Sequence, residues 1–212
     1  MVLALWPQSP GIADGPFTTI MQWDNSIQDA PRLFAGRRYG RKAESIEPYA
    51  DLPSRCKATF EIGLGGADAP RERLESLGWV LRDPLELTRN PSTYREFIAD
   101  SMAEFSVAKE GYITARSGWF SERSAAYLAS GRPVVVQDTG FTDWLEADGG
   151  VLAFKNPEEA CAAVADVRAR YGFHCREARR VAARCFDSDM VLRSLVERAM
   201  LPVASDNKST TR

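Results

Sequence analysis

Polar residues that could bind an anion stand directly before an alanine-rich segment in the second half of the chain. This stretch, SGWFSERSAAYLASG, begins at Ser117 and ends at Gly131. Ser121 can cap a helix over the alanine-rich part, and the first backbone amides of such a helix have no partner within it. These amides, the positive end of the helix dipole and the serine hydroxyls suit a phosphate group, which Gly118 would let approach closely. The alternative is that Ser121 is only a helix cap and Glu122 an exposed residue that the dipole favours.

Six short apolar runs of strand length are the elements that would position this loop. Most of them are too short and too continuously apolar for half-exposed strands, so a buried parallel sheet is favoured. The runs are Phe17 to Trp23, Ala58 to Gly65, Trp79 to Asp83, Tyr112 to Ala115, Val134 to Val136 and Val151 to Phe154.

Helical patterns lie between and after these runs. Strands that alternate with helices indicate right-handed βαβ units. We therefore predict an α/β fold, a Rossmann-like doubly wound parallel sheet of about six strands with a C-terminal helical segment. The predicted helices are Ala43 to Tyr49, Asp68 to Gly78, Ser92 through Phe105, a helix opened by Asn156 and Pro157, its continuation through Cys185, and a last helix starting between Asp187 and Asp189.

Three segments are expected along the chain. Residues 1–16 are predicted to be an interdomain connector, because prolines and glycines interrupt any periodicity there. Residues 17–203 have the length of one α/β domain. Residues 204–212 are polar and are predicted to be disordered.

The Rossmann strand order places a ligand at one edge of this sheet. The first and fourth strands are neighbours where the winding reverses, and ligands lie outside the carboxyl ends of these strands. The loop after the fifth run would border the same crevice. Aromatic residues in these loops could stack on a base or a sugar, although core filling explains them equally well. The candidate ligand-binding residues are Asp24, Asn25, Ser117, Gly118, Trp119, Phe120, Ser121, Glu122, Arg123, Asp138, Thr139, Gly140 and Phe141.

Composition argues against several other functions. A formal net charge of -2 gives no reason to expect a nucleic-acid partner, and the apolar runs are far shorter than a membrane span. A single histidine, His174, makes a Ser-His-Asp hydrolase improbable, and we expect it to have a helix-terminal or surface role. Four cysteines without a C-x-x-C pair argue against a zinc site and favour reduced thiols in a cytoplasmic protein. The first apolar run is followed by no G-x-G-x-x-G, which disfavours a dehydrogenase.

The stretch from Tyr112 to Val167 resembles the carboxyl-terminal domain of GT-B-fold glycosyltransferases. In that family a strand ends in a loop with serine and glycine, and an alanine-rich helix follows and ends in a motif that reads GRPVV here. The further matches are GVLAF and PEEA. The resemblance covers the second half of the chain well, whereas the first hundred residues agree mainly in strand order.

The resemblance implies a site for a nucleotide-diphosphate sugar, with no further cofactor and no metal. In such a site the residues from Ser117 to Ser121 would meet the diphosphate, Glu122 would approach the ribose or the sugar, and the loop from Asp138 to Phe141 would flank the sugar. Arg82 would lie near the base. Arg37 and Lys42 would correspond to the basic pair that many retaining members place on the diphosphate.

Two departures from the family bear on the function. Gly118 and Ala126 stand where retaining members often carry two glutamates, so the retaining or inverting outcome stays open. The chain also has room for one of the two Rossmann-like domains. The resemblance therefore implies the donor-binding half of a glycosyltransferase, inactive without an N-terminal acceptor-binding domain in cis or in trans. The alternative is a non-catalytic nucleotide-sugar-binding module or a subunit of a split enzyme.

Overall fold

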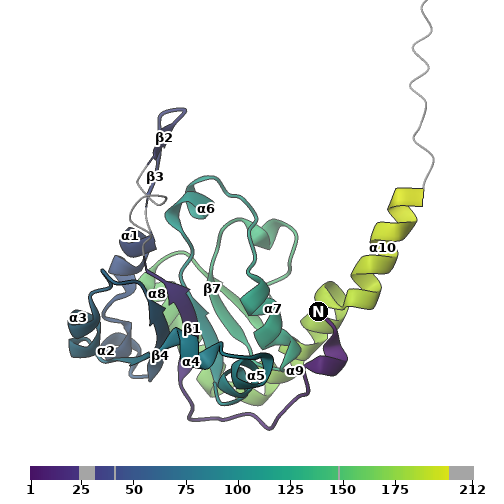
Figure 1. The fold of residues 1–212 in the computed structure, drawn as a ribbon, viewed down its shortest axis with the longest axis horizontal. Helices are drawn as coiled ribbons and strands as arrows, with labels where there is room; N and C mark the ends of the chain where they lie inside the picture. Colours follow the sequence, from purple (N-terminus) through teal and green to yellow (C-terminus); the bar gives the residue numbers. More distant parts are fainter. Residues whose placement is uncertain (24–31, 41, 148, 201–212) are drawn as a thin grey trace, which may run out of the picture.

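Six parallel strands form the central sheet of the computed structural model, which describes residues 1–23, 32–40, 42–147 and 149–200 (Figure 1). The strands follow the order β5-β4-β1-β6-β7-β8, which is the Rossmann order and confirms the predicted fold class. They are β1 (Phe17–Gln22), β4 (Phe60–Gly65), β5 (Trp79–Arg82), β6 (Ala103–Ser106), β7 (Val134–Gln137) and β8 (Val151–Phe154).

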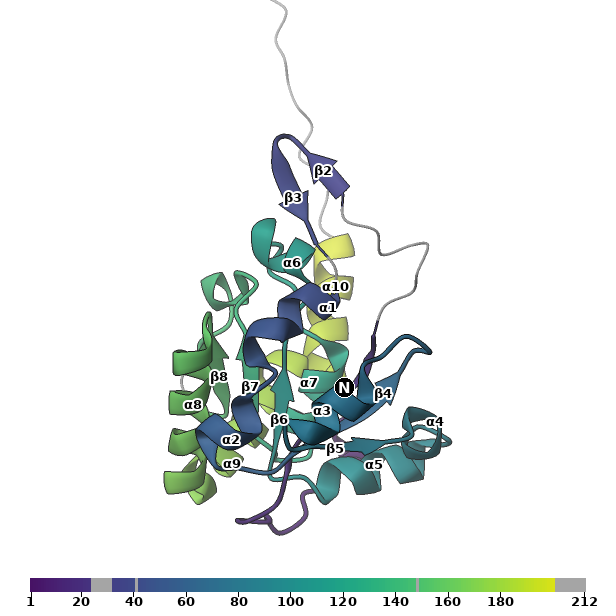
Figure 2. The ribbon, with the colours of Figure 1, turned by 90° about the vertical axis from the view of Figure 1, so that its left-hand side faces the viewer.

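Helices cover both faces of this sheet (Figures 1 and 2). One apolar cluster joins the sheet to α2, α3 and α8, and a second joins the opposite face to α5, α7 and α9. Neighbouring β7 residues divide between the clusters, with Val135 in the first and Val134 and Val136 in the second, as alternation along a strand requires. The helices are η1 (Leu3–Leu5), α1 (Lys42–Ile46), η2 (Glu47–Tyr49), α2 (Leu52–Cys56), α3 (Arg71–Ser76), α4 (Pro84–Leu87), α5 (Pro91–Ala99), α6 (Glu110–Thr114), α7 (Glu122–Ala129), η3 (Phe141–Asp143), α8 (Pro157–Ala169), α9 (Tyr171–Val181), η4 (Ala182–Phe186) and α10 (Ser188–Met200).

The fourth strand of the sheet is not the predicted one. The run from Tyr112 to Ala115 lies mostly in α6, and the strand that pairs with β1 is β6, which the prediction assigned to the end of a helix from Ser92. That helix, α5, is capped by Asn90 and already ends at Ala99. The following residues fit a helical spacing, and the charged Glu104 in the middle of β6 hides the apolar run that would mark a buried strand.

Two further expectations are corrected by the packing. Cys56 of α2 and Cys161 of α8 form a disulfide across a separation of 105 residues, where reduced thiols were predicted. The spacing of the cysteines carries no signal for a bond that tertiary packing brings about. His174 lies in the first turn of α9, but its side chain is only 1% exposed, and its Nδ1 accepts a hydrogen bond from the amide of Gly150 at 3.4 Å.

A small two-stranded sheet stands apart from the central one. It consists of β2 (Arg32–Phe34) and β3 (Arg37–Tyr39), which pair in antiparallel fashion. No such hairpin was predicted. Among the described residues, no helix combines the length and the apolar character needed to cross a bilayer.

Candidate functional site

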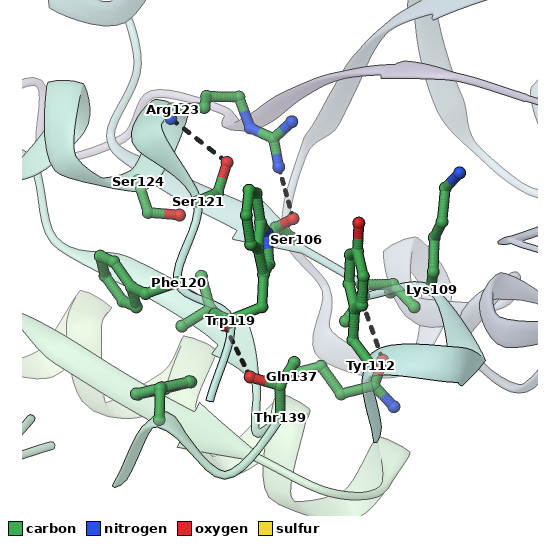
Figure 3. Close-up of a pocket in the computed structure, with 14 residues that line it drawn as sticks. Ser106, Lys109, Tyr112, Trp119, Phe120, Ser121, Arg123, Ser124, Gln137 and Thr139 are labelled. Atoms are coloured by element: carbon green, nitrogen blue, oxygen red, sulfur yellow. Dashed lines mark hydrogen bonds between the residues drawn. The ribbon is translucent and has the colours of Figure 1, made fainter. Parts of the chain in front are cut away.

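A cavity of about 160 Å³ lies at the carboxyl ends of β6 and β7 (Figure 3). The winding of the sheet reverses between β1 and its neighbour β6, so the cavity lies directly beside this switch point. The walls come from the loop after β6, from α6, from the start of α7 and from the loop after β7. The lining residues are Ser106, Val107, Ala108, Lys109, Tyr112, Trp119, Phe120, Ser121, Arg123, Ser124, Val136, Gln137, Thr139 and Phe141.

The amino-terminal end of α7 forms one wall of the cavity. The Ser121 hydroxyl accepts a hydrogen bond from the Arg123 amide at 3.2 Å, so Ser121 is the cap of this helix, as predicted. The amides of Phe120, Ser121 and Glu122 donate to no other group within the part of the chain that the structure describes. The wall therefore presents backbone donors and the positive end of a helix dipole to the cavity.

The loop before α7 is bound to the loop after β7. The Gly118 amide donates to the carbonyl of Thr139 at 3.0 Å, and the Thr139 hydroxyl donates to the carbonyl of Trp119 at 2.6 Å. Gly118 has a φ of +70°, a backbone conformation that favours glycine. The conformation and the amide of Gly118 thus hold the loop in place, and this amide is not among those that face the cavity unbonded.

Aromatic side chains at the cavity divide into exposed and buried ones. Trp119 is 48% exposed and stacks on Tyr112, with ring centroids 5.4 Å apart and planes 26° apart (Figure 3). Phe141 is 1% exposed, and Phe120 packs against it at 5.2 Å and against Phe186 at 5.3 Å. Phe141 therefore fills the core, whereas Trp119 offers a flat aromatic surface at the cavity.

A buried ion pair joins the start of α7 to the central sheet. Arg123 Nε donates to Glu104 Oε1 at 2.7 Å, and the two side chains are 17% and 0% exposed. The same guanidinium donates to the carbonyl of Ile20 at 2.7 Å and to the hydroxyl of Ser106 at 2.6 Å. Burial disfavours the charged guanidinium, but the Glu104 carboxylate more than offsets this and raises the pKa of Arg123. Arg123 thereby ties α7 to both strands at the switch point.

Gln137 organises the opposite wall. Its Oε1 accepts a hydrogen bond from the Ala108 amide at 3.1 Å, and its Nε2 donates to the Tyr49 hydroxyl at 3.1 Å. Burial, with Glu159 and Glu158 nearby, raises the pKa of Tyr49 to about 12, so this hydroxyl stays protonated at neutral pH. The loop after β6 is thus fixed to the core through an uncharged network.

Comparison with known proteins identifies the fold. No family model and no curated protein matches the sequence. Among solved structures, TarM from S. aureus in complex with UDP superposes with a TM-score of 0.60 at 13% identity over 90% of this chain. Sucrose-phosphate synthase from Thermosynechococcus elongatus gives 0.57 at 12% identity over 94%, and HepE from Anabaena with UDP and glucose gives 0.52 at 13% over 95%.

The chain has the fold of one Rossmann-like domain of the GT-B glycosyltransferases. It spans 36% of the TarM chain, 50% of the sucrose-phosphate synthase chain and 55% of the HepE chain. The fold predicted from the resemblance is therefore confirmed.

Within this Rossmann-like domain, the loops around α7 and after β7 bring many of the predicted site residues together. Trp119, Phe120, Ser121, Arg123, Thr139 and Phe141 line the cavity. Ser117, Gly118, Glu122, Asp138 and Gly140 belong to the same loops but do not line it.

Two acidic residues of these loops have surroundings that differ from each other. Glu122 is exposed in the first turn of α7. Asp138 is buried and accepts hydrogen bonds from the Gly140 amide at 2.8 Å and from the Thr142 hydroxyl at 3.2 Å, and Lys155 Nζ lies 3.7 Å away. Asp138 thus shapes the turn after β7.

The other predicted residues lie elsewhere. Arg82, at the end of β5, pairs with Glu61 at 3.1 Å and lines a separate cavity of about 300 Å³. Arg37 is exposed in β3, and Lys42 is the first residue of α1. Asp24 and Asn25 lie outside the described residues.

Several residues of the cavity were not predicted from the sequence. These are Ser106, Val107, Ala108, Lys109, Tyr112, Ser124 and Val136, whereas Gln137 belongs to the loop that was expected to border the crevice. Ser106 ends β6 and the next four residues follow it, and because this strand was assigned to a helix, no rule about strand ends could select them. One hint to the position of β6 lies in Glu104 and Arg123. A charged residue that is buried in a strand needs a partner of opposite charge, and Arg123 is that partner for Glu104. Within the described residues, no cluster of three or more histidine, cysteine, aspartate or glutamate side chains could hold a metal ion.

Proposed function

We propose that this chain is the donor-binding domain of a glycosyltransferase and holds the diphosphate of a nucleotide sugar in the cavity beside α7. The observation that carries the proposal is a cavity beside the switch point that is lined by Phe120 and Ser121, whose amides are unbonded, as is the neighbouring amide of Glu122 at the start of α7. Such amides bind phosphate oxygens, with charge-assisted hydrogen bonds worth about 1.5–3 kcal/mol each. TarM and HepE, which share the fold, were crystallised with UDP.

The remaining parts of the ligand would find partners in the same loops. Trp119 offers an exposed aromatic face for a base or a sugar ring. Glu122 and the loop from Asp138 to Phe141 stay candidates for contacts to ribose or sugar hydroxyls. Arg82, Arg37 and Lys42 would contribute only with a ligand or a second domain that reaches beyond the cavity.

We further propose that the domain has negligible transferase activity alone. No carboxylate or histidine is among the described residues that line the cavity, so the side chains that most often act as general acid or base are absent from this lining. An acceptor-binding domain, in cis or in trans, would provide this chemistry, with residues 1–16 as the connector and residues 17–203 as the donor-binding domain. A cavity lining without carboxylates or histidines is also compatible with the alternative, a non-catalytic nucleotide-sugar-binding module.

Titration calorimetry with UDP, GDP and ADP tests donor binding. We expect at least one of the three to bind at millimolar concentration or below. Trp119→Ala should weaken that binding about 5- to 150-fold, because stacking of a base on an aromatic ring is worth about 1–3 kcal/mol. Trp6→Ala is the matched control, since Trp6 packs on Tyr94 and lines other cavities. The absence of heat with all three nucleotides, or equal effects of the two variants, would contradict the proposal.

A further inference from the structure

The hairpin of β2 and β3 projects from the end of the central sheet at which the carboxyl ends of the strands and the cavity lie (Figures 1 and 2). Phe34 pairs with Arg37, and the two residues between them, Ala35 and Gly36, have φ values of +50° and +73°. Positive φ at both turn positions matches the tight turn that suits the twist of a hairpin. A Cβ atom placed on Gly36 would meet no heavy atom within 4 Å, so the tip of the hairpin stands clear of the described residues.

The base of the hairpin is fixed to the wall of the cavity. The Gly40 amide donates a hydrogen bond to the Glu110 carboxylate at the start of α6. The ring of Tyr39 lies against Gly111, where an added Cβ atom would be 3.5 Å from Tyr39 Cδ1. Because α6 also carries Tyr112 of the cavity lining, the hairpin and the cavity share one support.

The end of the hairpin carries two large apolar side chains in the open. Leu33 is 79% exposed and Phe34 is 72% exposed. Successive residues of a strand point to opposite faces, so these side chains cannot both lie on one flat protein surface. A layer of lipid can surround both faces of a narrow hairpin, which is why this arrangement favours a membrane over a protein partner.

The charge of the same segment is strongly positive. Residues 32–42 read RLFAGRRYGRK, with five basic and no acidic residues, although the whole chain has a formal net charge of -2. Arg37 is exposed, and Arg38 Nη1 donates a hydrogen bond to Glu44 Oε2 at 2.6 Å. Basic residues beside exposed apolar ones are the combination that binds the interface of an anionic bilayer.

We propose that the β2–β3 hairpin docks this chain on a membrane that contains anionic phospholipids. Leu33 and Phe34 enter the interface between headgroups and acyl chains, and the exposed Arg37 contacts the headgroups. Docking in this way places the cavity beside the bilayer surface, because the hairpin stands on α6. The proposal does not depend on what the cavity binds.

Sedimentation with vesicles tests the proposal on the full chain. The protein should pellet with phosphatidylcholine vesicles that contain about one third phosphatidylglycerol, less with pure phosphatidylcholine, and less as salt is raised. Arg37→Gln should lower the partition coefficient about five-fold, since a basic residue near the surface contributes about that factor. Leu33→Ser combined with Phe34→Ser should lower it at least about ten-fold.

Matched variants of other exposed residues are the controls. Leu85→Ser, Leu195→Ser and Arg176→Gln change exposed side chains outside the hairpin and should bind vesicles like the unchanged protein. Circular dichroism of each variant confirms that it folds. The proposal is overturned if the unchanged protein does not pellet with anionic vesicles, or if the double hairpin variant binds them equally well. It is also overturned if Leu195→Ser, on α10, abolishes binding while the hairpin variants do not. Binding to soluble polyglutamate that needs Arg37 but not Leu33 and Phe34 would assign the hairpin to an acidic protein instead.

Discussion

Replacing Arg123 by methionine should lower the free energy of unfolding by about 3–5 kcal/mol. The guanidinium donates to Glu104 at 2.7 Å, to the carbonyl of Ile20 at 2.7 Å and to Ser106 at 2.6 Å. Methionine keeps most of the apolar stem but none of these bonds. The larger part of the cost comes from Glu104, whose side chain is 0% exposed and would lose its countercharge.

A double-mutant cycle separates the ion pair from the other bonds of Arg123. Glu104→Gln keeps an oxygen that can accept from Arg123 but removes the negative charge, and should cost about 1–3 kcal/mol. In the double variant no unpaired charge stays buried, so it should be more stable than the Arg123→Met protein. This order requires a coupling energy between the two positions that exceeds the cost of Glu104→Gln alone, and we expect it to be about 3 kcal/mol.

Urea denaturation at pH 7, followed by tryptophan fluorescence, measures these free energies. Arg176→Met is the control, because an exposed arginine on α9 should contribute no more than about 0.5 kcal/mol. If Arg123→Met costs less than about 1 kcal/mol, or if the double variant shows the simple sum of the single effects, the ion pair does not support α7 as described.

Three further expectations concern stability away from the cavity. Reduction of the disulfide between Cys56 and Cys161 should destabilise the protein by up to about 4.7 kcal/mol, because the bond closes a loop of 105 residues. Urea denaturation with and without reductant measures this loss. The stability of the Cys161→Ser variant should not change with the reductant. Burial lowers the pKa of His174 below its usual value of 6.5, so the stability that the neutral ring contributes is present above that value and lost as the pH falls below it. His174→Gln should flatten the melting temperature between about pH 7 and pH 5, and an unchanged slope would contradict this account. Gly150→Ala should destabilise the protein by more than about 2 kcal/mol, because the new Cβ would lie 2.4 Å from the Ala178 amide nitrogen. Gly36→Ala, at a residue with a similar φ and open space around it, should cost only about 1 kcal/mol. Equal melting temperatures of the two variants would refute the steric argument.

Much of the fold follows from apolar runs and helix caps in the sequence. Five of the six strands and the order of the sheet agree with the prediction, because buried parallel strands are continuously apolar and few other segments of this chain are. The strand from Ala103 to Ser106 could not be found in this way, since Glu104 interrupts it. The residue that makes Glu104 tolerable, Arg123, lies 19 positions further along the chain. Only the folded structure brings the two together.

The candidate site was predictable where it depends on local geometry. Ser121 follows the rule for helix caps, and the loop containing Thr139 follows the rule for the ends of parallel strands. Lys109 and Tyr112 were missed because they follow the strand that was misassigned. The basic cluster around Arg37 was predicted to reach the diphosphate, but its hairpin geometry depends on contacts with α6 that no local pattern reveals.

A crystal structure with UDP or GDP bound would show whether the start of α7 holds the diphosphate. We expect phosphate oxygens within hydrogen-bond distance, about 2.7–3.2 Å, of the amides of Phe120, Ser121 or Glu122, and a ring of the ligand against Trp119. A nucleotide bound instead in the cavity beside Arg82, with the wall formed by α7 unoccupied, would contradict it.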